Sequence, residues 1–479
     1  MNRSIRRLYL SVVIGFGLLA GFLGWWQVVA AGSLEKQRGN PYVAEKERRI
    51  DRGQIVSADG QVLARSVLAK VRGQKVYRRV YPKGELAPHV VGYATTQLGS
   101  TGIEAQFNRY LAGSYGAEPL LRRLNLADKK GASVHLTLDT RVQAVANQAL
   151  AGRAGAVVAL DPRSGAILAM ASGPTFNLND VATNFAAIRN RSGAPLLSRP
   201  TQSRQPPGST FKVVTATSAL ESGRYTATTP FVDTGRFVLN GQAITNFHGA
   251  KYGAHTLEVA LTKSINTTFA RIGQDLGPQA LGTTMSAFGF GEKDPALLDL
   301  PSSMLVPSGR FDNGRLLPND EQGTDTPRIA IGQEKLAATP LQMAMVASAI
   351  ANGGVLRRPF LVRQVRDRGG DIVREGRPET LTTVTRPDVA SALSAMMQSV
   401  VREGTGTSAA LTGLEVAGKT GTAESGVPGR NQAWFIGFAP AANPVVAVAV
   451  LIEDTSGTGG ATAAPVAGQV MRAAVQVAR

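Results

Sequence analysis

The chain has 479 residues, and its 43% hydrophobic and 18% charged residues are typical of a folded protein of two or three domains. The absence of cysteine excludes disulfides, thiolate metal sites and cysteine nucleophiles, and it suits a protein that works outside the reducing cytosol. The formal net charge of +18 predicts attraction to polyanions such as anionic lipid or an anionic cell-wall polymer. We expect no nucleic-acid partner, because no basic helix carries interleaved aromatic residues.

The chain opens with an uncharged run over residues 8–31, which is long enough to cross a bilayer at about 20 residues per span. Trp25 and Trp26 lie toward its far end, where interfacial aromatic residues gather. A cleaved signal peptide is the competing interpretation, but its apolar core would be shorter, at about 7–15 residues. We therefore predict a cytoplasmic tail over residues 1–7 and an uncleaved, single-pass transmembrane anchor over 8–31.

Residues 32–130 are predicted to form a small N-terminal pedestal. An Asp59-Gly60 turn between apolar runs indicates a β-hairpin within residues 52–64. Short mixed elements follow, and residues 114–130 are polar and charged, as in a linker or an exposed loop.

Residues 131–479 are predicted to form one α/β domain. Apolar runs at 155–160 and 166–171 read as two strands, and those at 434–439 and 445–453 as two more. A small-residue helix is expected over 464–478. Because strands lie at both ends of this segment with helices between them, we expect an antiparallel sheet completed by the two extremities of the chain.

The run from Pro206 to Lys212 holds the first candidate for catalysis. Two prolines and a glycine cannot continue a helix, so the apolar stretch over 211–220 is expected to begin one, with Ser209 near its N-terminus. Lys212 then lies one turn away on the same face. A lysine amine with a lowered pKa can take the serine proton and activate the hydroxyl as a nucleophile. Alone, the Ser-x-x-Lys pattern also occurs on solvated helices.

A second motif, Ser264-Ile265-Asn266, lies between helical stretches. In an extended turn, the serine and asparagine side chains can point into one cleft. There the hydroxyl could relay a proton and the amide could hold a substrate carbonyl. The alternative is an ordinary helix cap.

The third motif is Lys419-Thr420-Gly421-Thr422. With Gly413 and Gly418 it also fits the phosphate-binding P-loop pattern, but that loop must open a helix, and later glycines and a proline forbid a long one. An edge strand fits better, because its side chains can bind a carboxylate while its backbone offers hydrogen bonds.

Ser-x-x-Lys, Ser-x-Asn-type and Lys-Thr-Gly motifs together are the signature of β-lactamases and penicillin-binding proteins. Behind a predicted anchor and in this order, they make the chain resemble class B penicillin-binding proteins, particularly the actinobacterial penicillin-binding protein A group. The resemblance covers nearly everything after the anchor, including the stretches 52–64, 102–104, 155–162, 206–212, 331–333, 351–354 and 417–425.

The resemblance implies the penicillin-binding transpeptidase or serine β-lactamase-like fold, an α/β (α+β) fold whose five-stranded antiparallel sheet is flanked by helices. It implies a serine D,D-transpeptidase that cross-links peptidoglycan stem peptides ending in D-Ala-D-Ala, is acylated by β-lactam antibiotics and uses no metal or organic cofactor. Ser209 would be the nucleophile, Lys212 the general base and Ser264 the proton shuttle to the leaving amine. The implied substrate-binding residues are Asn266, Lys419, Thr420, Gly421 and Thr422. The backbone N–H groups of Ser209 and Thr422 would form the oxyanion hole.

Three rival functions remain beside this one. A class A β-lactamase needs a deacylating Glu-x-x-Leu-Asn, and the nearest stretch, Glu258 to Thr262, lacks the asparagine and precedes Ser264. A D,D-carboxypeptidase shares every catalytic residue, and only the class B resemblance argues against it. A catalytically silent division scaffold is the alternative from another class. A lipase-type Gly-x-Ser-x-Gly is absent from the sequence.

About a hundred residues separate the anchor from the catalytic domain, too few for a glycosyltransferase domain and a linker, so we expect a monofunctional protein. The resemblance implies partners among division or elongation proteins, above all a membrane glycosyltransferase of the SEDS type that docks on the pedestal. It also implies a plasma-membrane location with the catalytic domain outside the cytoplasm.

Overall fold

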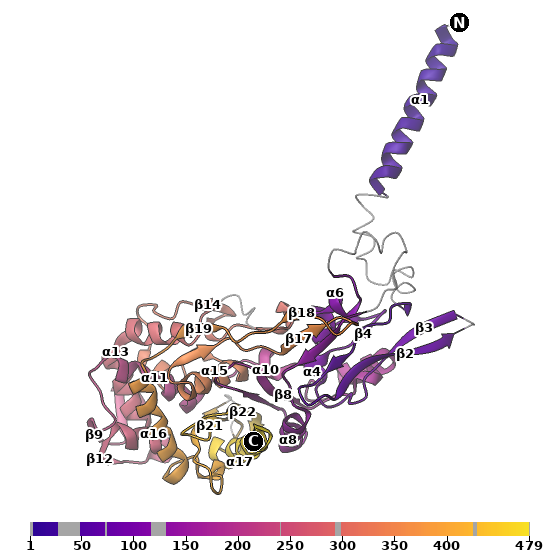
Figure 1. Ribbon diagram of the computed structural model, residues 1–479. Coiled ribbons are helices and arrows are strands. Elements are labelled where there is room, and N and C mark those ends of the chain that lie inside the picture. The colour runs from indigo at the N-terminus through magenta and orange to yellow at the C-terminus, as the bar shows by residue number, and fades with distance from the viewer. Residues whose placement is uncertain are drawn as a thin grey trace.

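The computed structural model describes residues 3–26, 48–71, 74–115, 131–239, 241–292, 298–424 and 429–478 (Figure 1). The predicted α/β fold is confirmed: a five-stranded antiparallel sheet lies between two layers of helices, and a second, mixed sheet lies on the N-terminal side. Most of the expected exposed loop at 114–130 lies outside the described residues.

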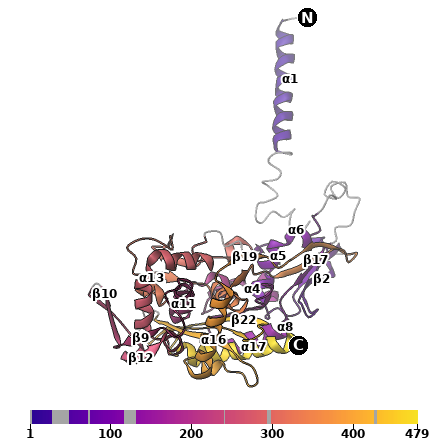
Figure 2. The ribbon, with the colours of Figure 1, turned by 60° about the vertical axis from the view of Figure 1, so that its left-hand side comes forward.

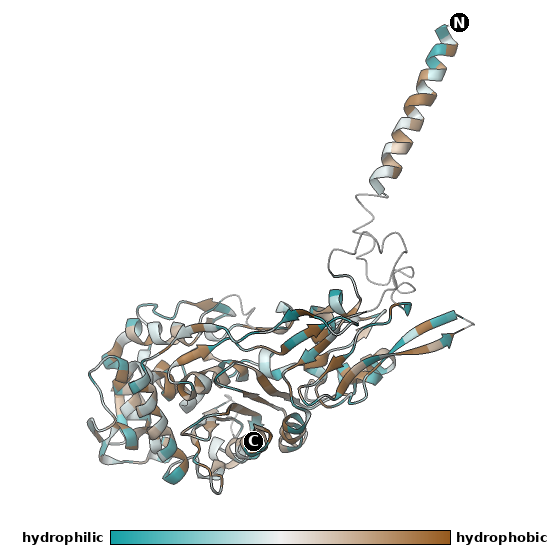
Figure 3. Ribbon diagram, in the orientation of Figure 1, coloured by the Kyte–Doolittle hydropathy of each residue, from teal (hydrophilic) through white to brown (hydrophobic). Residues whose placement is uncertain are grey.

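Helix α1 (Arg3–Gly24) contains the first part of the expected anchor. At about 1.5 Å per residue its 22 residues measure about 33 Å, which matches the ~30 Å hydrocarbon core of a bilayer. None of its residues is buried, and apolar residues line most of its length beyond the first turn (Figure 3). Within the described part of the chain, it is the one helix with the length and composition of a membrane span. Residues 27–31 lie outside the described residues.

The central sheet has the order β20–β21–β22–β7–β8, and all neighbours are antiparallel. Its strands are β7 (Gly155–Leu160), β8 (Ile167–Gly173), β20 (Ala417–Glu424), β21 (Asn431–Ala439) and β22 (Val446–Thr455). Strand β22 pairs with β7, so that Val450 lies opposite Val157 and the two ends of the domain meet in one sheet. The four predicted strands are thus found, with ends shifted by no more than about three residues.

Both faces of this sheet are buried, which explains why β22 reads as a continuous apolar run. Val448 and Val450 pack in a core with α8 (Thr140–Leu150) and α17 (Ala464–Ala478). Ala449 and Leu451 point the other way, into the larger core that includes α15 (Pro340–Ala351). Helix α17 has the predicted bounds and lies against β22 (Figure 2).

The pedestal segment contributes to a six-stranded sheet of order β18–β17–β6–β1–β2–β3. Its strands are β1 (Ile55–Val56), β2 (Val62–Val71), β3 (Gln74–Val80), β6 (Ser133–Leu136), β17 (Val362–Arg366) and β18 (Ile372–Glu375). The predicted hairpin is confirmed, with Ile55 paired to Ala64 across the turn. Three of the six strands come from beyond residue 130, so the sheet ties the pedestal segment to the rest of the chain. The β2–β3 hairpin projects from the body (Figure 1).

A buried ion-pair cluster joins two of the stretches that carry the family resemblance, residues 52–64 and 102–104. The fully buried carboxylate of Glu104 accepts hydrogen bonds from Arg52 at 2.8 Å and from Arg79 at 2.6 Å. Arg79 also donates to the carbonyl oxygen of Gly53 at 2.7 Å. Because a buried charge is tolerated only when it is paired, these residues hold α5 (Gly102–Gln106) against the start of the sheet.

The region between β8 and β20 forms most of the helical layers and the surroundings of the predicted site. Its elements used below are η3 (Gly208–Phe211), α11 (Lys212–Glu221), β9 (Pro230–Asp233), β10 (Arg236–Leu239), β11 (Gln242–Thr245), β12 (Gly253–Thr256), α12 (Leu257–Thr262), α13 (Asn266–Ala287), β13 (Gly309–Asp312), β14 (Arg315–Leu317), α14 (Thr326–Ala330), β15 (Leu336–Ala337) and α16 (Pro387–Glu403).

Candidate active site

The segment before α11 is folded tightly against the edge strand β20. Gly208 has a φ of +52°, and a Cβ atom there would lie 3.1 Å from the carbonyl oxygen of Thr422. Its N–H donates to the carbonyl oxygen of Gly332 at 3.1 Å. The predicted helix therefore begins one residue later than expected, after the 3₁₀ turn η3, and this turn places the half-buried Ser209 beside β20.

Lys212 is fully buried in the first turn of α11. Its Nζ lies 2.7 Å from the carbonyl oxygen of Ser264, 2.7 Å from Oδ1 of Asn266 and 3.3 Å from Oγ of Ser264. Burial, and then the positive charge of Lys419, hold the pKa of the Lys212 amine well below its usual range. The amine is therefore poised to lose its proton far more readily than a solvated lysine.

Lys419 reaches the same hydroxyl from the sheet. It lies on the edge strand β20, as predicted, and its Nζ donates to Oγ of Ser264 at 2.9 Å and to the carbonyl oxygen of Thr420 at 2.9 Å. Burial lowers the pKa of Lys419 to about 7. The hydroxyl of Ser264 thus lies between two buried amines, one from a helix and one from a strand.

Ser264 lies between α12 and α13, as the sequence predicts, but the turn is not extended at this residue. Its φ is +61°, in the left-handed region that a non-glycine residue adopts rarely. The next residue, Ile265, is completely buried and anchors the turn. This bend directs both Ser264 and Asn266 toward Lys212.

The other residues of the Lys-Thr-Gly-Thr motif line the strand on alternate sides. The hydroxyl of Thr420 lies 2.6 Å from that of Thr405, and Oγ1 of Thr422 accepts the N–H of Gly459 at 3.0 Å. Gly421 faces the segment over residues 206–209, called the nucleophile loop below because it carries the predicted nucleophile Ser209, and a Cβ atom on Gly421 would lie 2.8 Å from the carbonyl oxygen at position 207. The glycine is therefore what allows β20 to approach Ser209 closely.

Two polar residues behind the site were not singled out by the sequence. Oδ1 of Asn246 accepts the backbone N–H groups of Asn266 at 2.9 Å and Thr267 at 3.2 Å, which fixes the first turn of α13. Nδ2 of Asn246 donates to the buried carboxylate of Asp233 at 2.8 Å. Burial favours the neutral acid, but hydrogen bonds from Thr267, Tyr252, Gly235 and Asn246 outweigh it and hold the pKa of Asp233 below its usual value.

No motif marks Asn246, because it lies twenty residues before Asn266 in the sequence and contacts it only through the fold. The sequence does not predict that Asp233 is a buried carboxylate, because this depends on donors such as Asn246 and Thr267 that only the fold brings to it. These two residues fix the position of Asn266 without occupying the cleft.

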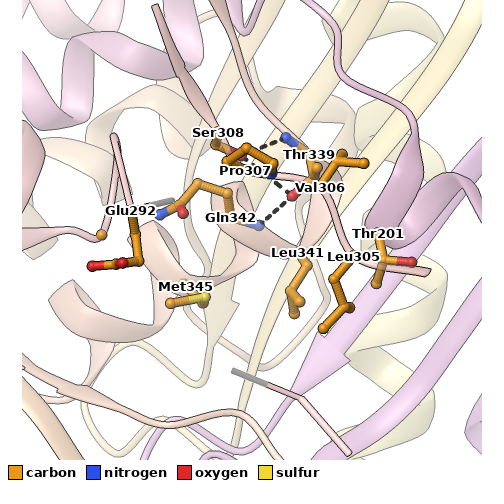
Figure 4. Close-up of a pocket in the computed structure, with 11 residues that line it drawn as sticks. Thr201, Glu292, Leu305, Val306, Pro307, Ser308, Thr339, Leu341, Gln342 and Met345 are labelled. Atoms are coloured by element: carbon orange, nitrogen blue, oxygen red, sulfur yellow. Dashed lines mark hydrogen bonds between the residues drawn. The ribbon is translucent and has the colours of Figure 1, made fainter. Parts of the chain in front are cut away.

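A separate small cavity of about 30 Å³ lies between segment 305–308 and α15 (Figure 4). Leu305, Leu341 and Met345 line its apolar side, and Ser308 accepts the N–H of Thr339 at 3.0 Å beside it. It has room for about two water molecules. None of the predicted site residues lines it, so it reflects packing rather than the site.

Among the described residues, no group of three or more histidine, aspartate or glutamate side chains could hold a metal ion. The chemistry available at this site is that of a half-buried hydroxyl beside two buried amines.

We predict that Asn246→Ala lowers the free energy of unfolding by about 2–4 kcal/mol, because two buried N–H groups and a buried carboxylate lose their partner. Denaturant unfolding of the purified protein measures it. Thr245→Ala is the matched control: this residue is exposed and contacts Asn266 only through its backbone oxygen, so we expect a change within about 0.5 kcal/mol. Equal effects of the two variants would contradict the assigned role of Asn246.

Known proteins match this chain along its whole length. A model described as the penicillin binding protein transpeptidase domain matches residues 155–472, and one described as the penicillin binding protein A dimerisation domain matches residues 52–134. The chain is 35% identical to the peptidoglycan D,D-transpeptidase PbpA of Mycolicibacterium smegmatis, covering 99% of both chains. It is 34% identical to the protein of the same name from Mycobacterium tuberculosis, again over 99% of both.

Solved structures are similar as well. Penicillin-binding protein A from M. tuberculosis, as its ceftriaxone acyl-enzyme complex, superposes with a TM-score of 0.80 at 32% identity, covering 90% of this chain and 100% of that one. The D,D-transpeptidase domain of a peptidoglycan glycosyltransferase from Eggerthella lenta gives a TM-score of 0.79 at 37% identity, covering 90% and 99%. With the transpeptidase model spanning well over half of its residues, the chain belongs to the penicillin-binding protein transpeptidase family.

Proposed function

We propose that this protein is a monofunctional peptidoglycan D,D-transpeptidase that works through an acyl-enzyme on Ser209. The observation that carries the proposal is the hydrogen-bonded set of Lys212, Ser264 and Lys419 beside the half-buried Ser209. The names of the relatives, and the β-lactam acyl-enzymes formed by similar structures, support the same reaction.

In the first half of the reaction, Oγ of Ser209 attacks the penultimate D-Ala carbonyl of a stem peptide. The neutral Lys212 amine takes the hydroxyl proton, a step for which a well-placed base contributes about 10²–10⁴ in rate. The C–N bond then breaks, and the terminal D-Ala leaves with a proton that passes through Ser264. The backbone N–H groups of Ser209 and Thr422 stabilise the oxyanion.

In the second half, an amine from a neighbouring strand attacks the ester. Its nitrogen bonds to the acyl carbon and loses a proton to the Lys212 amine, which is neutral again after the first half. The bond from that carbon to Oγ of Ser209 then breaks, and Oγ takes this proton from the Lys212 ammonium. Before the terminal D-Ala leaves, the donor stem peptide is held by Asn266 at its backbone and by the Lys-Thr-Gly-Thr strand at its terminal carboxylate. Nζ of Lys419, which donates to Oγ of Ser264 at 2.9 Å, supports this assignment because its N–H groups can also donate to a carboxylate.

We predict that a β-lactam adds one persistent mass adduct to the full-length protein and that Ser209→Ala abolishes it. Intact-mass spectrometry makes the measurement. Ser222→Ala is the matched control, because this serine lies at the end of α11 and its hydroxyl contacts only two nearby backbone groups, the Ala219 carbonyl oxygen and the N–H of Arg224, so this variant should be acylated normally. Rapid turnover of the drug would favour a β-lactamase instead, and a folded protein without an adduct would favour the scaffold.

We also predict a rise in the acylation rate with pH. The base must be neutral, and an amine is neutral above its pKa, so the rate falls as the pH falls through the lowered pKa of Lys212. Lys419→Gln removes a like charge, raises the pKa of Lys212 and moves the rising limb to higher pH. Stopped-flow measurement of the acylation rate at a series of pH values gives the position of this limb. Lys263→Gln, which removes an exposed lysine next to Ser264, should leave the limb in place. If the rising limb of the pH–rate profile does not move in Lys419→Gln, the result counts against Lys212 as the general base.

We further propose that α1 anchors the protein in the plasma membrane with the catalytic domain outside the cytoplasm, and that the pedestal docks a SEDS-type membrane glycosyltransferase. The β2–β3 hairpin supports this docking. Val67, Leu68 and Val71 are 41%, 51% and 53% exposed on its outer half, where an unpartnered soluble hairpin would favour polar residues.

We expect Leu68→Ser combined with Val71→Ser to reduce co-purification of the polymerase with the detergent-solubilised protein several-fold. Val232→Ser is the control, since Val232 is 62% exposed but lies on β9, in the catalytic domain. Unchanged recovery in the hairpin variant would remove the hairpin from the interface.

A further inference from the structure

A polar groove of about 470 Å³ lies outside the site described above. Its walls come from the first residue of β11, from β13, β14 and the chain leading into α14, and from residues 334 and 335. No residue assigned a catalytic or substrate-binding role above lines it. Two of the segments that form its walls nevertheless continue to residues that hydrogen-bond to the predicted site.

The first connection runs through Gly332, which accepts the N–H of Gly208 next to the nucleophile. Glu334, which lines the groove, is two residues further, so at most about 7 Å of chain separates these two points. The second connection is β11, whose last residue, Thr245, accepts a hydrogen bond from Nδ2 of Asn266 at 3.0 Å. The groove is therefore connected through the backbone, at two points, to residues beside the predicted site.

The charges of the groove are not balanced. Its three basic residues each pair with a carboxylate: Arg310 with Glu321, Arg328 with Asp325, and Lys335 with Asp312. Glu334 is a fourth carboxylate, and within the described part of the chain it has neither a hydrogen bond nor an ion pair. Its unpaired negative charge beside the nucleophile loop is complementary to an ammonium group.

The groove also holds hydrogen-bond donors without acceptors. The Arg310 side chain is only 4% exposed, and its Nε has no partner among the described residues; the same holds for the buried Oγ1 of Thr324. The ion pair of Arg310 with Glu321 is long, at 3.3 Å, and Glu321 is 43% exposed, so an incoming oxygen could displace it. Unpartnered buried donors are costly, and a ligand carboxylate or carbonyl would satisfy them.

The backbone beside the groove is unusual as well. Glu334 and Lys335 are consecutive non-glycine residues with φ values of +56° and +59°. The chain holds this conformation with a hydrogen bond from the N–H of Phe311 to the carbonyl oxygen of Lys335 at 2.8 Å. Residues kept in this sparsely populated region cluster at binding sites, where the surrounding structure compensates their cost.

We propose that this groove binds the acceptor strand, the peptide whose amine takes the acyl group from Ser209; the inference rests on the function proposed above. Glu334 attracts the ammonium form of the amine, and Arg310 and Thr324 bind a carboxylate or carbonyl of the same peptide. At most about 7 Å of chain separates Glu334 from Gly332, whose carbonyl oxygen bonds the N–H of Gly208, so an amine attracted to Glu334 is brought close to Ser209. The groove binds and orients the peptide, and proton transfer stays with Lys212 and Ser264.

The test uses full-length protein in detergent whose donor site has first been filled by acylation with penicillin G. A synthetic stem tetrapeptide with a free side-chain amine and a C-terminal carboxylate is then titrated by calorimetry. We expect Glu334→Gln to weaken binding about tenfold and Thr324→Val several-fold. Asp320→Asn, which makes the same charge change at an exposed residue outside the groove, should bind within twofold of the wild type. Acetylating the amine of the peptide should abolish the difference between wild type and Glu334→Gln.

The outcomes separate the two proposals. A wild type that is not acylated by penicillin refutes the proposed function and, with it, the acceptor groove. Normal acylation with no peptide binding, or with equal binding by Glu334→Gln and Asp320→Asn, overturns the groove alone. A Glu334→Gln variant that loses acylation, peptide binding and thermal stability together would show a structural residue, which also overturns it.

Discussion

The structure depends on two lysine amines that are buried against a single serine hydroxyl. Lys212 and Lys419 are both completely buried, and both lie within hydrogen-bond distance of Oγ of Ser264. In the described part of the chain, neither amine bonds to a carboxylate. Removing an ammonium group from water without a counter-ion is unfavourable, so burial lowers the pKa of both amines. A lowered pKa is what the proposed base, Lys212, requires.

The surrounding fold supplies what this arrangement needs. One amine comes from a helix and the other from an edge strand, so the sheet and α11 must approach closely. Small residues allow that approach: a Cβ atom at Gly421 would collide with the nucleophile loop, and one at Gly332 would lie 1.9 Å from the carbonyl oxygen of Gly208. Asn246 and Asp233 then hold the turn that carries Ser264, whose strained backbone would otherwise relax.

The sequence predicted the central sheet well, because β7 and β22 are apolar runs that are too short for helices and are bounded by turn residues. It also singled out Ser209, Lys212, Ser264 and the β20 motif, because they lie in short conspicuous patterns, and their catalytic roles stay predictions. The 3₁₀ turn before α11 and the left-handed turn at the second motif were missed, since both depend on tertiary contacts. The six-stranded sheet could not be predicted from the sequence either, because β17 pairs with β6 across more than two hundred residues.

The order of the strands has a consequence for biogenesis. Strand β7, near residue 155, pairs with β22, near residue 450, and β20 is at the far edge beyond β21. A chain still emerging from the ribosome or crossing a membrane holds its nucleophile helix but lacks the strand that carries the second amine. Long-range pairing of this kind is slow to form. The residues proposed to act together are therefore assembled only after nearly the entire chain has been delivered, so an unfinished chain would hold Ser209 and Lys212 without Lys419.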